Sequence, residues 1–193
     1  MLVGVVGLNG SGKDTVAIYL AEHYGFDYRD LGQEVREEVR GRNLNPLDRN
    51  VMVEIANEMR QRFGFDYWCR RVINSSKSND LVITSLRNPA EIELIKSNGG
   101  TIFEVHAEQR MRFERTVERV RSDPSKHGDV GSFEDFVAKE ERELTNADPA
   151  KQQLIKCIAM ADMGLDNNGT LTSLHLQIDG AMAALRSGPV RGH

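Results

Sequence analysis

The chain has 193 residues, of which 39% are hydrophobic, and its formal net charge is −4 at pH 7. This length predicts a single domain with a substantial core, and the acidic balance argues against a general nucleic-acid-binding or membrane-binding surface. No apolar run of the sequence is long enough to span a bilayer. The two cysteines, Cys69 and Cys157, lack the spacing of metal ligands, so we expect a reduced, cytoplasmic environment.

The first predicted element is a buried strand over residues 2–7, an apolar run without the basic flank of a signal peptide. It leads into Gly7-x-x-x-x-Gly12-Lys13 and then into an amphipathic helix from about residue 13 to residue 23. A strand, a glycine-rich loop, a lysine and a helix in this order are typical of a phosphate-binding P-loop, in which backbone N–H groups, the helix dipole and the lysine surround phosphates. The residues predicted to bind a nucleoside triphosphate, which we expect to be ATP, are Gly7, Asn9, Gly10, Ser11, Gly12, Lys13, Asp14 and Thr15.

One residue departs from the P-loop pattern. The position after the lysine normally carries a serine or threonine whose hydroxyl binds Mg²⁺, but here it is Asp14, which is followed by Thr15. Carboxylate oxygens suit Mg²⁺, so Asp14 is a candidate metal ligand, either directly or through water. Equally, an acid in the first turn of a helix interacts with the helix dipole alone.

Beyond the P-loop, strands and helices alternate, which predicts a parallel sheet with ligands at the carboxyl ends of its strands. We expect a three-layer α/β P-loop NTPase fold, with a five-stranded parallel sheet flanked by helices. The stretches over 32–76 and 108–146 are too long and too polar to be simple crossovers, so we expect them to close over ligands. The expected elements are an extended segment over 27–31, helices over 32–42 and 48–76, a strand over 80–85, a helix over 90–97, a strand over 101–106, helical structure over 108–146, a helix over 149–161, a strand over 163–166, a helix over 171–185 and a flexible tail over 187–193.

Short motifs occur in a characteristic order at residues 31–38, 86–93, 112–115, 132–136 and 161–170. On these motifs the chain resembles P-loop nucleotide kinases of the adenylate kinase and dephospho-CoA kinase group, and it is similar to an archaeal group described as related to adenylate kinase. The Lys-Asp-Thr ending of its P-loop is similar to that of phage deoxynucleoside monophosphate kinases. The resemblance implies a core, an acceptor-binding segment over 32–76 and a lid over 108–146.

The resemblance also implies candidates for binding the phosphate acceptor. Arg36, four residues after Gly32, matches the arginine that holds the acceptor phosphate in adenylate-kinase-like proteins, and Arg60 and Arg87 are the next candidates. Each of these arginines is alternatively a partner in an ion pair. Asp30 lies about where dephospho-CoA kinases place a carboxylate that activates an alcohol, but we favour the simpler interpretation that it caps the following helix.

In the expected lid, Arg112, Arg115 and Arg119 share one helical face, where a basic stripe suits the phosphates of ATP. We expect Arg115 and Arg119 to act in catalysis with Lys13 and Arg87. Glutamates between these arginines make a solvated, salt-bridged helix the alternative. Weaker candidates are Lys126 and His127 in the loop that follows, and Asn167 and Gly169, which match a loop beside the adenine ring in related kinases or form a simple turn.

Relatives often carry an acid at the end of the third core strand, where this chain has Thr84, and that acid helps to hold Mg²⁺.

The preferred hypothesis is a kinase that transfers the γ-phosphate of ATP to a nucleoside monophosphate or deoxynucleoside monophosphate, with Mg²⁺ as cofactor. One alternative is transfer to a hydroxyl, as in dephospho-CoA kinases or nucleoside kinases. A second is an ATP-binding switch or slow ATPase. The expected partner is a nucleotide-like small molecule, and the protein is expected to be a monomer or a homodimer.

Overall fold

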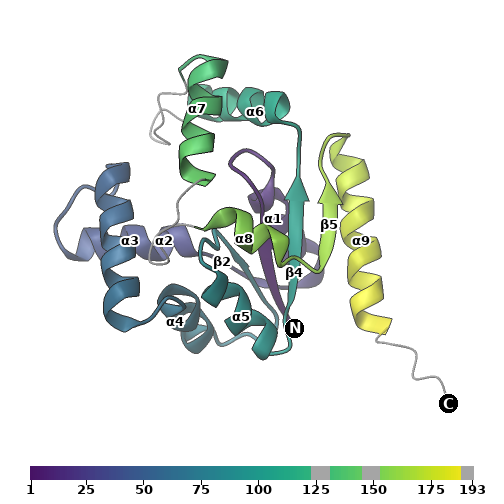
Figure 1. Ribbon diagram of the computed structural model, residues 1–193. Helices are drawn as coiled ribbons and strands as arrows, with labels where there is room; N and C mark the ends of the chain where they lie inside the picture. Colours follow the sequence, from purple (N-terminus) through teal and green to yellow (C-terminus); the bar gives the residue numbers. More distant parts are fainter. Residues whose placement is uncertain (123–130, 145–152, 188–193) are drawn as a thin grey trace.

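The structure is a computed structural model that describes residues 1–122, 131–144 and 153–187 (Figure 1). Its centre is a five-stranded parallel sheet in the order β2-β3-β1-β4-β5, which confirms the predicted sheet. The middle strand pairs with a neighbour on each side, and Gly4 lies opposite both Ile83 and Ile102. The strands are β1 (Leu2–Val6), β2 (Asp27–Asp30), β3 (Leu81–Thr84), β4 (Thr101–His106) and β5 (Met163–Asp166).

Helices cover both faces of the sheet, because successive side chains of a strand point to opposite faces. In β1, Val3 and Val5 pack toward the layer of α1 and α9, whereas Val6 packs toward the layer of α5 and α8 (Figure 1). The helices of the described residues are α1 (Lys13–Tyr24), α2 (Leu31–Gly41), α3 (Arg49–Phe63), α4 (Tyr67–Ser75), α5 (Pro89–Ser97), α6 (Gln109–Ser122), α7 (Phe133–Leu144), α8 (Leu154–Ala159) and α9 (Leu171–Ser187).

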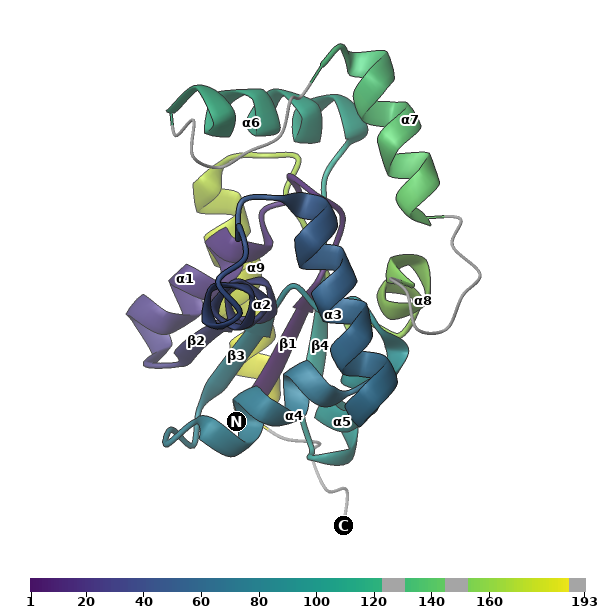
Figure 2. The ribbon, with the colours of Figure 1, turned by 90° about the vertical axis from the view of Figure 1, so that its left-hand side faces the viewer.

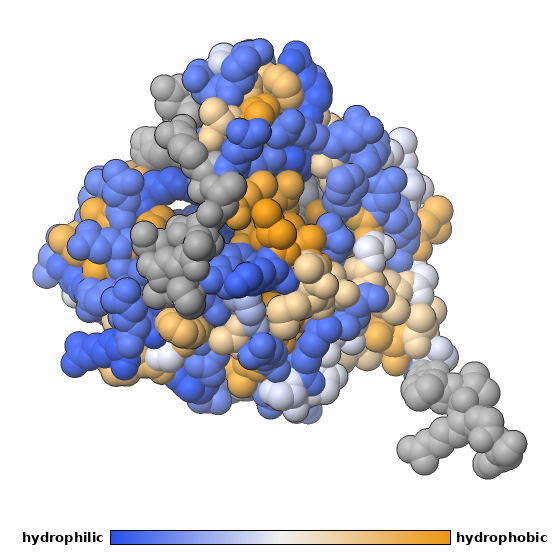
Figure 3. Space-filling model, viewed as in Figure 1, coloured by the Kyte–Doolittle hydropathy of each residue, from blue (hydrophilic) through white to orange (hydrophobic). Residues whose placement is uncertain are grey.

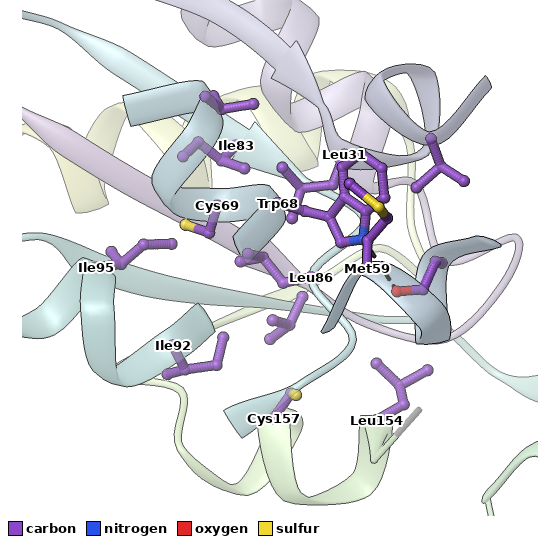
Figure 4. Close-up of a cluster of buried hydrophobic side chains, with 14 of the residues drawn as sticks. Leu31, Met59, Trp68, Cys69, Ile83, Leu86, Ile92, Ile95, Leu154 and Cys157 are labelled. Carbon is purple, nitrogen blue, oxygen red and sulfur yellow. Dashed lines mark hydrogen bonds between the residues drawn. The ribbon is translucent and has the colours of Figure 1, made fainter. Parts of the chain in front are cut away.

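The segment expected to bind the acceptor folds as α2, α3 and α4 and packs against the core. Trp68 of α4 is fully buried, and its indole N–H donates a hydrogen bond of 3.2 Å to the backbone carbonyl of Ala56 in α3 (Figure 4). The helical structure predicted over 48–76 is confirmed but interrupted, because Gly64 ends α3 with a φ of 106°, which no α-helical residue adopts. The chain then restarts as α4 at Tyr67.

The lid-like stretch contains α6 and α7, which lie above the carboxyl ends of the strands (Figure 2). Phe113 of α6 packs edge-to-face against Phe133 and Phe136 of α7, with ring centroids 5.4 and 5.6 Å away. Residues 123–130, 145–152 and 188–193 lie outside the described residues, and so do Lys126, His127, the start of the predicted helix over 149–161 and most of the tail. None of the helices in the described ranges is long and apolar enough to cross a membrane.

Candidate functional site

The glycine-rich loop joins the end of β1 to the start of α1 and follows the geometry that a P-loop requires. Gly7, Gly10 and Gly12 all have positive φ, at 147°, 79° and 103°. A Cβ at Gly10 would lie 2.5 Å from the backbone oxygen of Arg112, and a Cβ at Gly12 would lie 2.2 Å from the side-chain nitrogen of Asn167. Side chains are therefore excluded at these positions, and the loop backbone remains open to an anion.

Lys13 begins α1 with its side chain only 8% exposed, and its Nζ donates to the backbone oxygen of Leu8 at 2.9 Å. Burial, followed by the positive charge of Arg87, lowers the pKa of Lys13 to about 7. Asp14 and Asp30 oppose this effect on the pKa of Lys13, while Arg119 adds to it. A polyphosphate bound in the loop would place negative charge beside Lys13 and favour its protonated form.

This lowered pKa predicts a pH-dependent stability of the ligand-free protein. The ordinary pKa of lysine is 10.5, so between about pH 7 and that value the unfolded chain holds a proton on Lys13 that the folded protein has released. The cost of burying this charge is thus fully present below pH 7 and falls as the pH rises. We expect Lys13→Met to melt at a higher temperature than the wild type at pH 6.5, with a difference that shrinks toward pH 9. Melting curves in this range test this, with the exposed Lys77→Met as the control; a pH-independent difference would contradict it.

Oxygen donors gather beside the P-loop where the metal ion of a nucleotide would be expected. Asp14 is exposed in the first turn of α1, and the hydroxyl of Tyr28 donates to its Oδ1 at 3.0 Å. The same hydroxyl lies 3.3 Å from Oγ1 of Thr84. No group of three or more metal-binding side chains of the His, Cys, Asp and Glu types occurs in the described part of the chain. One carboxylate with nearby hydroxyls, among them Thr15, fits Mg²⁺, which keeps several waters and takes its other ligands from phosphates.

Asp30 ends β2 directly beside Thr84 at the end of β3. Its Oδ1 accepts a hydrogen bond from the backbone N–H of Gly32 at 3.0 Å, which is the helix cap expected from the sequence. Its Oδ2 lies 3.4 Å from Nη1 of Arg36. The structure therefore brings Asp30, Gly32 and Arg36 together at the start of α2, in the segment expected to bind the acceptor.

Arg87 follows β3, and its backbone is held on both sides. Its N–H donates to Oε2 of Glu91 at 2.7 Å, and its carbonyl accepts from the N–H of Gln153 at 2.8 Å. Its guanidinium reaches the P-loop, where Nη2 donates to Oδ1 of Asn9 at 3.2 Å. Arg87 is thus anchored beside the loop that is expected to hold the phosphates.

Arg60 lies in the interior rather than in an open site. It is buried and donates to Oε1 of Glu91 through Nε at 3.3 Å and Nη2 at 3.0 Å. This contact is the ion pair that the sequence offered as the alternative role of Arg60. Because the backbone N–H of Arg87 donates to the other oxygen of Glu91, Arg60 supports Arg87 indirectly. Its predicted role in binding substrate has no support in this geometry, so we do not carry it into the proposed function.

The lid arginines on α6 differ in what they contact. Arg112 is buried, donates to the backbone oxygens of Ala107 and Asn9 at 2.9 and 3.3 Å, and pairs with Glu140 of α7. Nη2 of Arg115 donates to the backbone oxygen of Asn167 at 2.8 Å. Arg119 is exposed. Because Arg119 influences the pKa of Lys13, it is the lid arginine whose charge reaches the P-loop lysine.

Asn167 follows β5 and is a buried link to the P-loop. Its Nδ2 donates to the backbone oxygen of Ser11 at 2.8 Å, and its backbone N–H donates to the oxygen of His106 at 2.8 Å. These contacts hold the loop that contains the exposed Gly169 against the P-loop. A position beside an adenine ring stays a prediction for both Asn167 and Gly169.

Sequence reasoning missed Tyr28, Glu91 and Glu140. A signal for Glu91 was present, because Asn88 with a glutamate three residues later forms a capping box at the start of α5. Tyr28 precedes Asp30 by two residues, which places both side chains on one face of a strand. Glu140 had no local signal, since its partner Arg112 belongs to another helix.

A second concave region is less suited to a nucleotide. It lies between the P-loop, β4 and the lid, and aliphatic side chains form most of its lining, including Leu8, Leu144, Ile155 and Ile158. In Figure 3, hydrophobic residues gather around α8, below α6 and α7. Such a lining disfavours phosphate groups, so the glycine loop with its cations remains the candidate nucleotide site.

Comparison with known proteins agrees with this geometry. A family model described as an AAA domain matches residues 3–145. A UPF0200 protein of the archaeon Thermoplasma volcanium is 31% identical over 173 residues, which cover 88% of this chain and 89% of that protein. Among solved structures, shikimate kinase from Bacteroides thetaiotaomicron has a TM-score of 0.60 at 11% identity, covering 96% of this chain and 98% of that one. A gluconokinase from Sinorhizobium meliloti has a TM-score of 0.53 at 17% identity, covering 96% and 93%. These structures show that the fold is that of P-loop kinases.

Proposed function

Because this chain belongs to the UPF0200 family and carries an AAA domain, we propose that it is a kinase that transfers the γ-phosphate of ATP to a small-molecule acceptor. The observation that carries this proposal is the glycine loop between β1 and α1, in which Gly7, Gly10 and Gly12 all take positive φ. Lys13 is buried at the start of α1 beside this loop, and Arg87 is close enough to lower its pKa. Backbone N–H groups, a helix N-terminus and a lysine in this arrangement suit a polyphosphate.

In this proposal each group has a defined role. The N–H groups of the P-loop and Lys13 hold the β- and γ-phosphates, while Arg87 and Arg119 stabilise the charge on the phosphoryl group during transfer. Mg²⁺ would be held by Asp14 with help from the hydroxyl of Thr15, and when bound it neutralises phosphate charge and orients the nucleotide. Arg115 supports this arrangement by holding the Asn167 loop against the P-loop.

We propose that the acceptor is a nucleoside monophosphate or deoxynucleoside monophosphate. Arg36 lies at the start of the expected acceptor segment, and Arg87 lies beside the P-loop. An acceptor phosphate would therefore meet one guanidinium where the acceptor binds and another where the γ-phosphate is transferred. A phosphate acceptor is already a nucleophile and needs no base.

A hydroxyl acceptor is the second candidate, and the position of Asp30 favours it. This carboxylate stands at the carboxyl end of β2, close enough to Lys13 to raise its pKa, which is where a base for an alcohol would act. Two structural neighbours are named as kinases of shikimate and gluconate, which are hydroxyl acceptors. Dephospho-CoA and nucleosides are the candidates of this class.

The test is ADP formation from ATP and Mg²⁺ with a panel of nucleoside monophosphates, nucleosides, dephospho-CoA, shikimate and gluconate. We expect turnover with a monophosphate, and Asp30→Asn to keep most of it. With a hydroxyl acceptor, the loss of a general base would instead lower turnover by about 10²- to 10⁴-fold. Asp48→Asn is the matched control, because Asp48 also caps a helix but is not among the residues proposed to contact the acceptor or the phosphates. ADP formation that is indifferent to every acceptor would contradict the proposed function.

A further inference from the structure

Tyr28 connects the sheet to the first turn of the helix that follows the P-loop. Its ring packs against the core layer between the sheet, α1 and α9. Its hydroxyl lies 3.0 Å from Oδ1 of Asp14 and 3.3 Å from Oγ1 of Thr84. No feature of the nucleotide site described so far requires a tyrosine at this position.

The chemistry of the three groups sets the direction of these hydrogen bonds. A carboxylate only accepts, so Tyr28 uses its single proton to donate to Asp14. The hydroxyl of the fully buried Thr84 must then donate to the oxygen of Tyr28.

Asp14 needs such a partner because of where it lies. It is exposed at the first turn of α1, where an unrestrained side chain would lose conformational freedom on binding a metal ion. A carboxylate has about four lone-pair sites, so a hydrogen bond at Oδ1 leaves capacity to bind a cation or a water on a cation. Thr84, the last residue of β3, is the far end of the same hydrogen-bonded chain.

We propose that Tyr28 is a positioning residue that orients Asp14 toward the divalent cation of the bound nucleotide, a role that rests on the proposed function. Thr84 completes the arrangement by fixing the hydroxyl of Tyr28. The chain thereby obtains one oriented carboxylate at the P-loop. Partners that orient a metal ligand typically contribute about 10- to 100-fold to metal affinity or activity.

The test measures binding of Mn²⁺, as a paramagnetic substitute for Mg²⁺, to the full-length protein in complex with ADP. Electron paramagnetic resonance of free Mn²⁺ gives the affinity without requiring turnover. We expect Tyr28→Phe to weaken Mn²⁺ binding at least about tenfold, with ADP affinity in the absence of metal unchanged. Tyr24→Phe is the matched control, because Tyr24 lies at the opposite end of α1 from Asp14, where its hydroxyl donates to Asp179, and the change should leave Mn²⁺ affinity unchanged.

A double-mutant cycle shows whether Tyr28 acts through Asp14. Asp14→Asn should weaken Mn²⁺ binding, and adding Tyr28→Phe to it should weaken binding no further. Wild-type Mn²⁺ affinity in Tyr28→Phe would overturn the inference, and so would fully additive losses in the double variant. If Tyr28→Phe does not fold, Thr84→Val, which removes the donor to Tyr28, should weaken Mn²⁺ binding several-fold, and an unchanged affinity would overturn the inference. A wild-type protein that binds no ADP would instead overturn the proposed function.

Discussion

Lys13→Met is expected to lower turnover by about 10²- to 10³-fold while the protein stays folded. The methionine keeps the apolar stem that is buried beside the P-loop but removes the charge that we propose contacts the β- and γ-phosphates. Folding should not suffer, because burial and Arg87 already disfavour that charge when no nucleotide is bound. Most of the loss should appear in the rate of the chemical step, since the phosphoryl group gains its strongest interaction with the lysine during transfer.

The measurement is ADP formation under saturating ATP and Mg²⁺, with the acceptor that supports the wild type. Lys77→Met, on an exposed residue, is the matched control and should keep full turnover. Circular dichroism verifies that both variants are folded. Unchanged turnover in Lys13→Met would show that this loop does not bind the transferred phosphate.

Glu91→Ala is expected to cause the largest loss of stability, about 3 to 5 kcal/mol. The carboxylate is 0% exposed and accepts hydrogen bonds from Arg60 and from the backbone N–H groups of Arg87 and Asn88. Removing it leaves the guanidinium of Arg60 buried without its charge partner. For a protein of this size, such a loss lowers the melting temperature by on the order of 10 °C.

Thermal and denaturant unfolding test this prediction. Glu93→Ala, an exposed glutamate in the same helix, is the control and should change stability by less than about 0.5 kcal/mol. Adding Arg60→Met to Glu91→Ala should recover part of the lost stability, because no unpaired charge then remains buried. Equal melting temperatures for Glu91→Ala and Glu93→Ala would mean that the ion pair contributes nothing to the fold.

The sequence does not distinguish arginines that are available to bind phosphate from arginines that are buried in ion pairs. Arg60 and Arg112 have the chemistry of phosphate ligands, and helical periodicity gives no reason to separate them from Arg36 or Arg119. In the structure both are buried in ion pairs, with Glu91 and Glu140, at sequence separations of 31 and 28 residues. A carboxylate so distant in sequence leaves no local pattern, and only packing of the helices brings the charges together.

The break between α3 and α4 has a different cause. Apolar residues at helical spacing run from Val51 to Phe63, and residues 48–76 are predicted to be helical without a break. Gly64 takes a positive φ that ends the helix, and the burial of Trp68 under α3 stabilises the turn. A glycine within a periodic stretch is compatible with either outcome, and the tertiary contact decides between them.

The sequence by itself determined the P-loop, the parallel sheet and the helix cap at Asp30. Each depends on residues that are close in the chain. The P-loop depends on glycines at fixed spacing and the sheet on apolar runs between helices. The cap depends on a carboxylate that accepts a hydrogen bond from an N–H two residues later. Only the tertiary structure decided which charged groups lie beside the P-loop, which are buried in pairs, and that Tyr28 meets both Asp14 and Thr84. Those contacts join residues that lie 14 and 56 positions apart, and the Asn167 link to the P-loop spans 156. The physical reason is that electrostatic and hydrogen-bond energies depend on distance in space, which only the packing of the chain defines.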